Sequence, residues 1–188
     1  MALDFLRFGH LTLSGPALPE PFVRFELERA LAKLKLLPDS TGLSGQKLGD
    51  EWKVLQRKIR DISANSGPLA ISNKVLEPLT SRLGYAALDD AQEVQTREGL
   101  ESGGALMQAA APGSEAAPPH IRCWTTDFDA DLDAPTRRGH AYRYSPTRIA
   151  QRVLLASGER LGLLTNGTQL RLLICDPARP DSFLEFDL

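Results

Sequence analysis

The feature that most constrains the fold of this chain is a pair of short apolar runs joined by Asn-Gly near its C-terminus. The first run spans residues 161–165 and reads Leu-Gly-Leu-Leu-Thr, and the second spans residues 170–175. Asn166 and Gly167 lie between them, and both residue types tolerate the positive φ of a type I′ turn. The pattern therefore predicts a β-hairpin, and the last third of the chain is organised around it.

Residues 120–188 alternate between predicted strands and one predicted helix. An apolar run at 121–125 indicates a strand, and residues 182–188 indicate the final one. Ser145 and Pro146 begin the helix, because serine caps helix N-termini and proline at the first helical position loses no hydrogen bond. Gly158 suits the C-terminal end of this helix, which we expect near residues 146–157.

The first half of the chain is predicted to be largely helical. Helices are expected near residues 22–36, 46–63 and 68–83. The second of them carries an apolar stripe in steps of four and three residues, typical of a helix face packed in a core or against a partner helix. The stripe consists of Leu48, Trp52, Leu55, Ile59 and Ile62.

A further hairpin is expected between these helices and the last third of the chain. Its arms are residues 93–97 and 105–108, with Gly103 and Gly104 weakening the second arm. Residues 109–119, which are rich in alanine and proline, predict a flexible internal loop. The expected sheet is built from residues 93–108, 120–126, 160–175 and 183–188.

Length and composition favour one globular domain. The chain has 188 residues, of which 42% are hydrophobic and 24% charged, so we expect a single α/β domain with an arm and helix at residues 1–45. A net charge of −2 gives no global sign of nucleic-acid binding, so such a site must be local. The apolar runs are shorter than the ~20 residues that span a bilayer, and the N-terminus does not read as a signal peptide. These features predict a cytoplasmic protein without membrane partners.

Several short motifs in the last third carry a resemblance to a known family. They are Leu132–Pro135 with Gly139, Tyr142–Ser145, Gly162–Gly167, Leu170–Leu172 and Asp176–Ser182. The series resembles the N-terminal nuclease-like domain of large adenine methyltransferases from type II-G restriction–modification, BREX and DISARM phage-defence systems. The resemblance covers about residues 67–188.

The resemblance implies a restriction-endonuclease-like fold, with a mixed sheet flanked by helices. In such enzymes a carboxylate on one strand and an acid–any–Lys triplet on the next hold a divalent cation. Here the strand at 121–126 has neither an acid nor a lysine, and Gly103-Gly104-Ala105 stands where the first acid belongs. We therefore predict a nuclease-like module with no catalytic residues, no metal ligands and no cofactor. The methyltransferase motifs are also missing, so that activity is expected elsewhere in a longer protein or on another chain.

An acidic loop follows the strand at 121–126. It contains Asp127, Asp129, Asp131 and Asp133. The first three have the spacing of an EF-hand loop, but Leu132 and Arg138 stand where that loop needs glycine and glutamate. We interpret the loop as solvated. The alternative is a metal-dependent nuclease whose active site has migrated to Glu101, Asp127 and Asp129.

A basic stretch follows the acidic loop, with six arginines and one glutamate between residues 137 and 160. Arg148 and Arg152 are four residues apart and share a face of the expected helix. The arginines before them precede the helix N-terminus, which favours phosphate. The predicted DNA-binding residues are Arg137, Arg138, Arg143, Arg148 and Arg152. The alternative is that these arginines only neutralise the aspartates.

Two functions remain open from the sequence beside the migrated-site nuclease described above. The first is a non-catalytic module of a phage-defence or restriction–modification system, which contacts the DNA backbone or assembles with a methyltransferase or other subunits. The second is a protein–protein interaction scaffold without a role on DNA.

Overall fold

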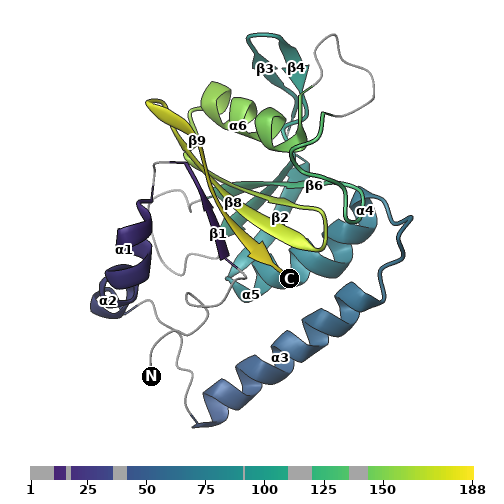
Figure 1. Ribbon diagram of the computed structural model, residues 1–188. Helices are drawn as coiled ribbons and strands as arrows, with labels where there is room; N and C mark the ends of the chain where they lie inside the picture. The colour runs from purple at the N-terminus through teal and green to yellow at the C-terminus, as the bar shows by residue number, and fades with distance from the viewer. Residues whose placement is uncertain (1–10, 16–17, 36–41, 91, 110–119, 136–143) are drawn as a thin grey trace.

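The computed structural model describes residues 11–15, 18–35, 42–90, 92–109, 120–135 and 144–188. Its centre is a seven-stranded mixed sheet in the order β1-β9-β8-β7-β6-β5-β2 (Figure 1). The strands are β1 (Leu11–Ser14), β2 (Tyr85–Asp90), β5 (Ala105–Ala109), β6 (His120–Thr125), β7 (Leu161–Thr165), β8 (Gln169–Asp176) and β9 (Arg179–Asp187). Only β6 and β7 pair in parallel within this sheet, and α6 (Pro146–Ser157) makes the crossover between them.

The N-terminal half is helical, as the apolar spacing predicts. The helices are α1 (Glu20–Phe25), α2 (Leu27–Lys33), α3 (Gly42–Arg60), α4 (Pro68–Ile71) and α5 (Glu77–Arg82). The single helix expected at 22–36 is interrupted at Glu26, which ends α1 and begins α2. A π-helical segment, Ser72–Leu76, joins α4 to α5 just before Pro78. Proline cannot donate to the carbonyl four residues back and collides with it, so a wider turn before Pro78 relieves the clash.

The caps of α6 confirm the expected helix. The Ser145 Oγ accepts a hydrogen bond from the Arg148 N–H at 3.3 Å, and Gly158 adopts the left-handed conformation with φ 72°. Both ends of this helix are therefore set by local chemistry that the sequence displays.

The expected hairpin between residues 93–97 and 105–108 is wrong. β3 (Val94–Thr96) instead pairs with β4 (Gly99–Glu101) in a separate two-stranded sheet, and β5 pairs with β2 and β6. The chain turns at Gly104, where φ is +74°, and so leaves β4 before β5 begins. β1 and β2 also extend the sheet beyond its expected strands.

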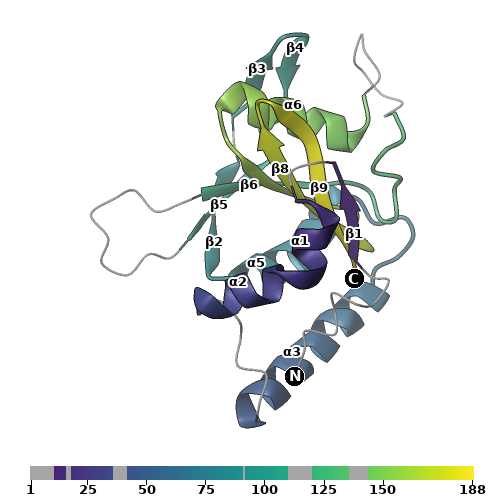
Figure 2. The same cartoon turned by 60° about the vertical axis from the view of Figure 1, so that its left-hand side comes forward.

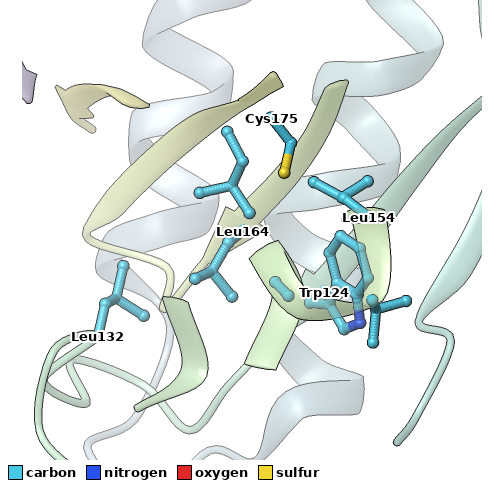
Figure 3. Packing of buried hydrophobic residues seen from close by; sticks show 8 residues of the cluster. Trp124, Leu132, Leu154, Leu164 and Cys175 are labelled. Carbon is cyan, nitrogen blue, oxygen red and sulfur yellow. The ribbon is translucent and has the colours of Figure 1, made fainter. Parts of the chain in front are cut away.

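The face of the sheet under α6 is closely packed. Trp124 and Leu164 point from neighbouring parallel strands towards Leu154 of α6, and Leu132 and Cys175 complete the same cluster (Figure 3). Leu154 and Leu164 are at most 1% exposed. A fully buried leucine contributes roughly 1.5–3 kcal/mol through removal of its apolar surface from water. This cluster therefore fixes α6 on the sheet.

The opposite face is covered by the helices of the N-terminal half. Strand alternation places Cys123 and Leu163 on this side, next to Leu76 and Met107. Burial raises the pKa of the Cys123 thiol to about 12, so this cysteine behaves as a small apolar core residue. Figure 1 and Figure 2 both show α6 on one side of the sheet and α3 standing away from the other.

Candidate functional site

Asn166 organises the turn between β7 and β8. Its side chain is buried, and its Nδ2 donates to the Ala130 carbonyl at 2.8 Å. Its Oδ1 accepts from the backbone N–H groups of Thr168 at 3.0 Å and Gln169 at 2.7 Å. The hairpin is confirmed, but the type I′ turn is wrong, because Gly167 has a positive φ of 91° and Asn166 does not. The asparagine side chain adds to the backbone hydrogen bond of the turn, from the Asn166 N–H to the Gln169 carbonyl, and ties the turn to the acidic loop.

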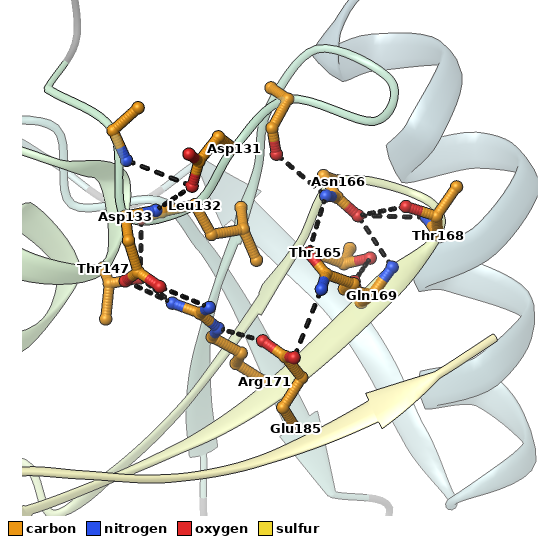
Figure 4. A network of polar contacts seen from close by, with 12 residues as sticks. Asp131, Leu132, Asp133, Thr147, Thr165, Asn166, Thr168, Gln169, Arg171 and Glu185 are labelled. Carbon is orange, nitrogen blue, oxygen red and sulfur yellow. Dashed lines mark hydrogen bonds and ion pairs between the residues drawn. The ribbon is translucent and has the colours of Figure 1, made fainter. Parts of the chain in front are cut away.

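Arg171 lies at the centre of a polar network below this turn (Figure 4). It is 5% exposed, and its Nη1 and Nη2 each donate to one oxygen of Asp133 at 2.7 Å. Its Nε donates to Glu185 at 2.6 Å, and its Nη1 also donates to the Thr147 hydroxyl at 2.6 Å. The guanidinium lies 4.3 Å from the centroid of the Phe183 ring. One buried cation thus joins the acidic loop, α6, β8 and β9.

The charge balance of this network favours ionised groups. Hydrogen bonds from Arg171 hold the pKa of Asp133 below its usual range, although partial burial opposes that shift. Gln169 donates to Glu185 at 3.2 Å and connects the arginine to the Asn166 turn. Asp133, Asn166 and Arg171 all belong to the motifs that carry the family resemblance. Their hydrogen bonds give these motif residues a structural role, since Asn166 and Arg171 both hold the loop between β6 and α6 in place.

The position of the expected nuclease site is filled by an indole. A Cβ added to Gly104 would lie 2.5 Å from the Cys123 carbonyl oxygen and 2.9 Å from the Trp124 ring. Trp124 also donates from Nε1 to the Ser102 carbonyl at 3.1 Å and packs against Gly162. A carboxylate at position 104 would therefore displace Trp124 from the core.

The structure does not gather the alternative acidic residues Glu101, Asp127 and Asp129 into one cluster. Glu101 is 8% exposed and pairs with Arg152 at 3.7 Å. Asp129 accepts a hydrogen bond from the Thr168 hydroxyl at 2.9 Å, and Asp127 is exposed. Within the described ranges, no group of three or more histidine, cysteine or acidic side chains is arranged to hold a metal ion.

The predicted DNA-binding arginines have different environments. Arg137, Arg138 and Arg143 lie outside the described residues. Arg148 is exposed and forms an ion pair with Asp181, which is also exposed.

Arg152 faces the small β3–β4 sheet instead of solvent. It pairs with Glu98, donates to the Thr96 hydroxyl at 2.8 Å and stacks on Tyr144 at 4.3 Å. Arg152 therefore joins β3–β4 to α6, unlike Arg148, which pairs with an exposed carboxylate. Whether any of these arginines contacts DNA stays a prediction.

An apolar groove lies between α3 and α5. The C-terminal half of the α3 stripe is buried, with Ile59 and Ile62 both 7% exposed. In its N-terminal half, Trp52 is 41% exposed and Leu48 36%. These two residues line a groove of about 870 Å³ together with Leu55, Leu79 and Leu83.

The groove adjoins a second apolar cleft of about 1030 Å³ beneath the sheet. Trp52, Leu79 and Leu83 line both hollows, while Leu163 and Leu170 belong to the floor of the cleft. The stripe was predicted to pack in a core or against a partner helix. Its C-terminal residues, Ile59 and Ile62, do pack in the core, whereas Leu48 and Trp52 remain partly exposed. We call the two adjoining hollows the α3 groove.

Searches of protein families, curated proteins and solved structures found no match to this chain. Among the described helices, none combines the length and apolar character needed to cross a membrane.

Proposed function

We propose that this chain is a non-catalytic, nuclease-like module that assembles with a methyltransferase or another subunit of a phage-defence or restriction–modification system. The α3 groove carries the proposal. It exposes the edges of Trp52 and Leu48 next to Leu83, which is 63% exposed. Contiguous exposed apolar surface on a globular protein marks an interaction site, and large aromatic residues in such sites carry much of the binding energy.

The nuclease-like part of the proposal is supported by connectivity. The structure has the hairpin β2–β5, then β6, the crossover helix α6, and the strands β7 and β8. The first arm of the antiparallel pair is β2 and not the expected residues 93–97, but the mixed sheet flanked by helices agrees with the architecture that the resemblance implies. The absence of catalysis is supported by Trp124, which occupies the place next to Gly104. We expect purified protein with magnesium or manganese to leave plasmid DNA intact, and cleavage lost in Asp127→Ala would establish the migrated site instead.

Binding to an adenine methyltransferase from the same genome tests the assembly role. We expect a complex in size-exclusion chromatography, and Trp52→Ala should weaken it about 30-fold in calorimetry, because truncating a central aromatic anchor costs roughly 2 kcal/mol. Leu69→Ala is the matched control, since Leu69 is 76% exposed on α4 and does not line the groove. Equal losses in both variants would contradict the role of the groove.

DNA contact is the second candidate function. Arg57, Lys58 and Arg60 are exposed at the C-terminal end of α3, and Arg148 is exposed on α6. These side chains give an acidic protein local basic surface, which suits weak, sequence-independent contact with phosphates.

A further inference from the structure

A cavity of about 540 Å³ lies at the N-terminal end of α6. Its lining includes Asp133 from the acidic loop, Arg148 and Gln151 from α6, and Phe183 from β9. A volume of this size accommodates a small organic ligand. The cavity lies on the side of the sheet opposite the α3 groove, so its occupancy is independent of the assembly role.

Gln151 is the unusual member of this cavity. It is only 4% exposed and lines the cavity, but its amide is not among the described side-chain groups that are sealed from solvent without a partner, so the amide reaches the open space of the cavity. Helical side chains lean towards the helix N-terminus, which directs this amide along α6 towards the cavity. A glutamine amide offers one acceptor and two donors to a ligand in the cavity.

The neighbouring polar groups already satisfy one another. The Ser145 Oγ accepts from the Arg148 N–H, and the Thr147 hydroxyl donates to the Leu132 carbonyl at 2.8 Å. Both carboxylate oxygens of Asp133 accept from Arg171. A ligand in the cavity must therefore complement the amide of Gln151.

The charged groups that the structure describes around the cavity are paired as well. Asp133 is neutralised by Arg171, and Asp181 is neutralised by Arg148. This balance disfavours a free anion and favours an uncharged ligand. Tyr144 and Phe183 line the cavity as aromatic walls, and each has a guanidinium 4.3 Å from its ring centroid.

We propose that this cavity binds an adenine base. A glutamine amide pairs with adenine through two hydrogen bonds, accepting from N6 and donating to N7, and aromatic side chains stack on bases. Guanine presents two acceptors at the same edge and would leave the amide oxygen unpaired. The base comes either from a free adenine nucleoside or from an unpaired adenine in a single strand.

Calorimetric titration of the full chain with adenosine tests the proposal. Adenosine should bind at least about tenfold more tightly than guanosine or 7-deazaadenosine, which lacks the N7 acceptor. Gln151→Leu should abolish this preference, and its melting temperature should stay within a few degrees of that of the wild type, because the substitution conserves the size of a side chain that lines an open cavity.

Two oligonucleotides identify the source of the base. Binding of oligo-dA much tighter than adenosine, with oligo-dT weak, would assign the cavity to single-stranded nucleic acid, whereas equal affinity per base would assign it to the free nucleoside. Failure of both adenosine and oligo-dA to bind would overturn the proposal. So would equal affinity of the wild type for adenosine and 7-deazaadenosine, a result that needs no variant to fold.

Discussion

The two faces of the central sheet are covered in different ways. On one face, α6 is short, capped at both ends and buried against Trp124, Leu164 and neighbouring residues. On the other face, α3 is longer, but only the C-terminal end of its apolar stripe is buried, and Trp52 and Leu48 remain partly exposed. A long helix with an apolar stripe therefore does not by itself make a closed core.

The difference suits two roles, a rigid scaffold on the α6 side and a contact surface on the α3 side. The α6 side also contains the Arg171 network, whose hydrogen bonds join four segments of the chain. Closed packing and paired charges on that side favour a rigid scaffold. The α3 side has apolar surface without a matching element among the described residues, which suits contact with another chain.

A large loss of stability is expected from Arg171→Met. The substitution leaves the carboxylate of Glu185, which is 9% exposed, without its cation. Breaking a buried ion pair by removing one partner costs roughly 3–5 kcal/mol. In urea unfolding, the free energy of unfolding should fall by about 3 kcal/mol. We expect the lower end of the roughly 3–5 kcal/mol range because the Asp133 side chain is 61% exposed and stays solvated without Arg171.

Arg97→Met is the control for this substitution, since Arg97 is exposed in the β3–β4 turn. It should change the free energy of unfolding by less than about 0.5 kcal/mol. A similarly small effect of Arg171→Met would show that the network does not hold the closed side together.

A matched pair of leucine substitutions compares the two faces directly. Leu154→Ala removes a side chain that is 0% exposed and should lower the free energy of unfolding by about 2–5 kcal/mol. Leu83→Ala in the α3 groove should cost less than about 1 kcal/mol, because Leu83 is 63% exposed. Both values come from urea unfolding, and comparable losses would mean that the two faces are equally closed.

The Arg171 network should make stability depend on acidic pH. The folded pKa of Asp133 is lower than the unfolded value, which is about 3.9 for an aspartate. Its contribution is therefore fully present above the unfolded pKa and is lost as pH falls through the folded pKa.

Asp133→Asn isolates this contribution. The free energy of unfolding of the variant should lie below that of the wild type at pH 6, and the gap should narrow as the pH is lowered through 4. A gap that stays constant with pH would assign the effect of the substitution to shape and not to charge.

Local signals in the sequence predict much of the α6 side. Ser145, Pro146 and Gly158 mark the ends of α6, and the apolar runs mark β6, β7 and β8. These signals depend on residues close in sequence, so short-range chemistry determines them. The β3–β4 pairing was missed because strand pairing depends on where the chain turns, and Gly104 directs it away from β4.

The polar contacts could not be predicted, because their partners are far apart in sequence. Arg171 and Asp133 are separated by 38 residues, and neither pattern nor spacing links them. One signal was available, since Arg171 is the sole charged residue in the apolar run at 170–175. A charge in such a run must be paired when the strand is buried. Gln151 gave no comparable signal.

The smallest change in the free energy of unfolding is expected for Arg148→Ala, because Arg148 lies on the surface of the α6 side. The same substitution tests DNA binding. Arg148→Ala should leave stability within about 1 kcal/mol of the wild type, because exposed ion pairs contribute little. If Arg148 contacts a phosphate, the variant should lower affinity equally for all sequences and reduce the log–log salt slope by roughly 0.9 in fluorescence anisotropy.

Asp181→Ala sharpens this test, because it removes the carboxylate that pairs with Arg148. Freed from its partner, Arg148 should bind phosphate more strongly, so affinity should rise in Asp181→Ala and fall in Arg148→Ala. The double variant should match Arg148→Ala, because Asp181 acts on DNA mainly through this arginine. Affinity changes of the same sign in both single variants would place the DNA contact elsewhere, with the exposed basic residues Arg57, Lys58 and Arg60 of α3 as the next positions to test.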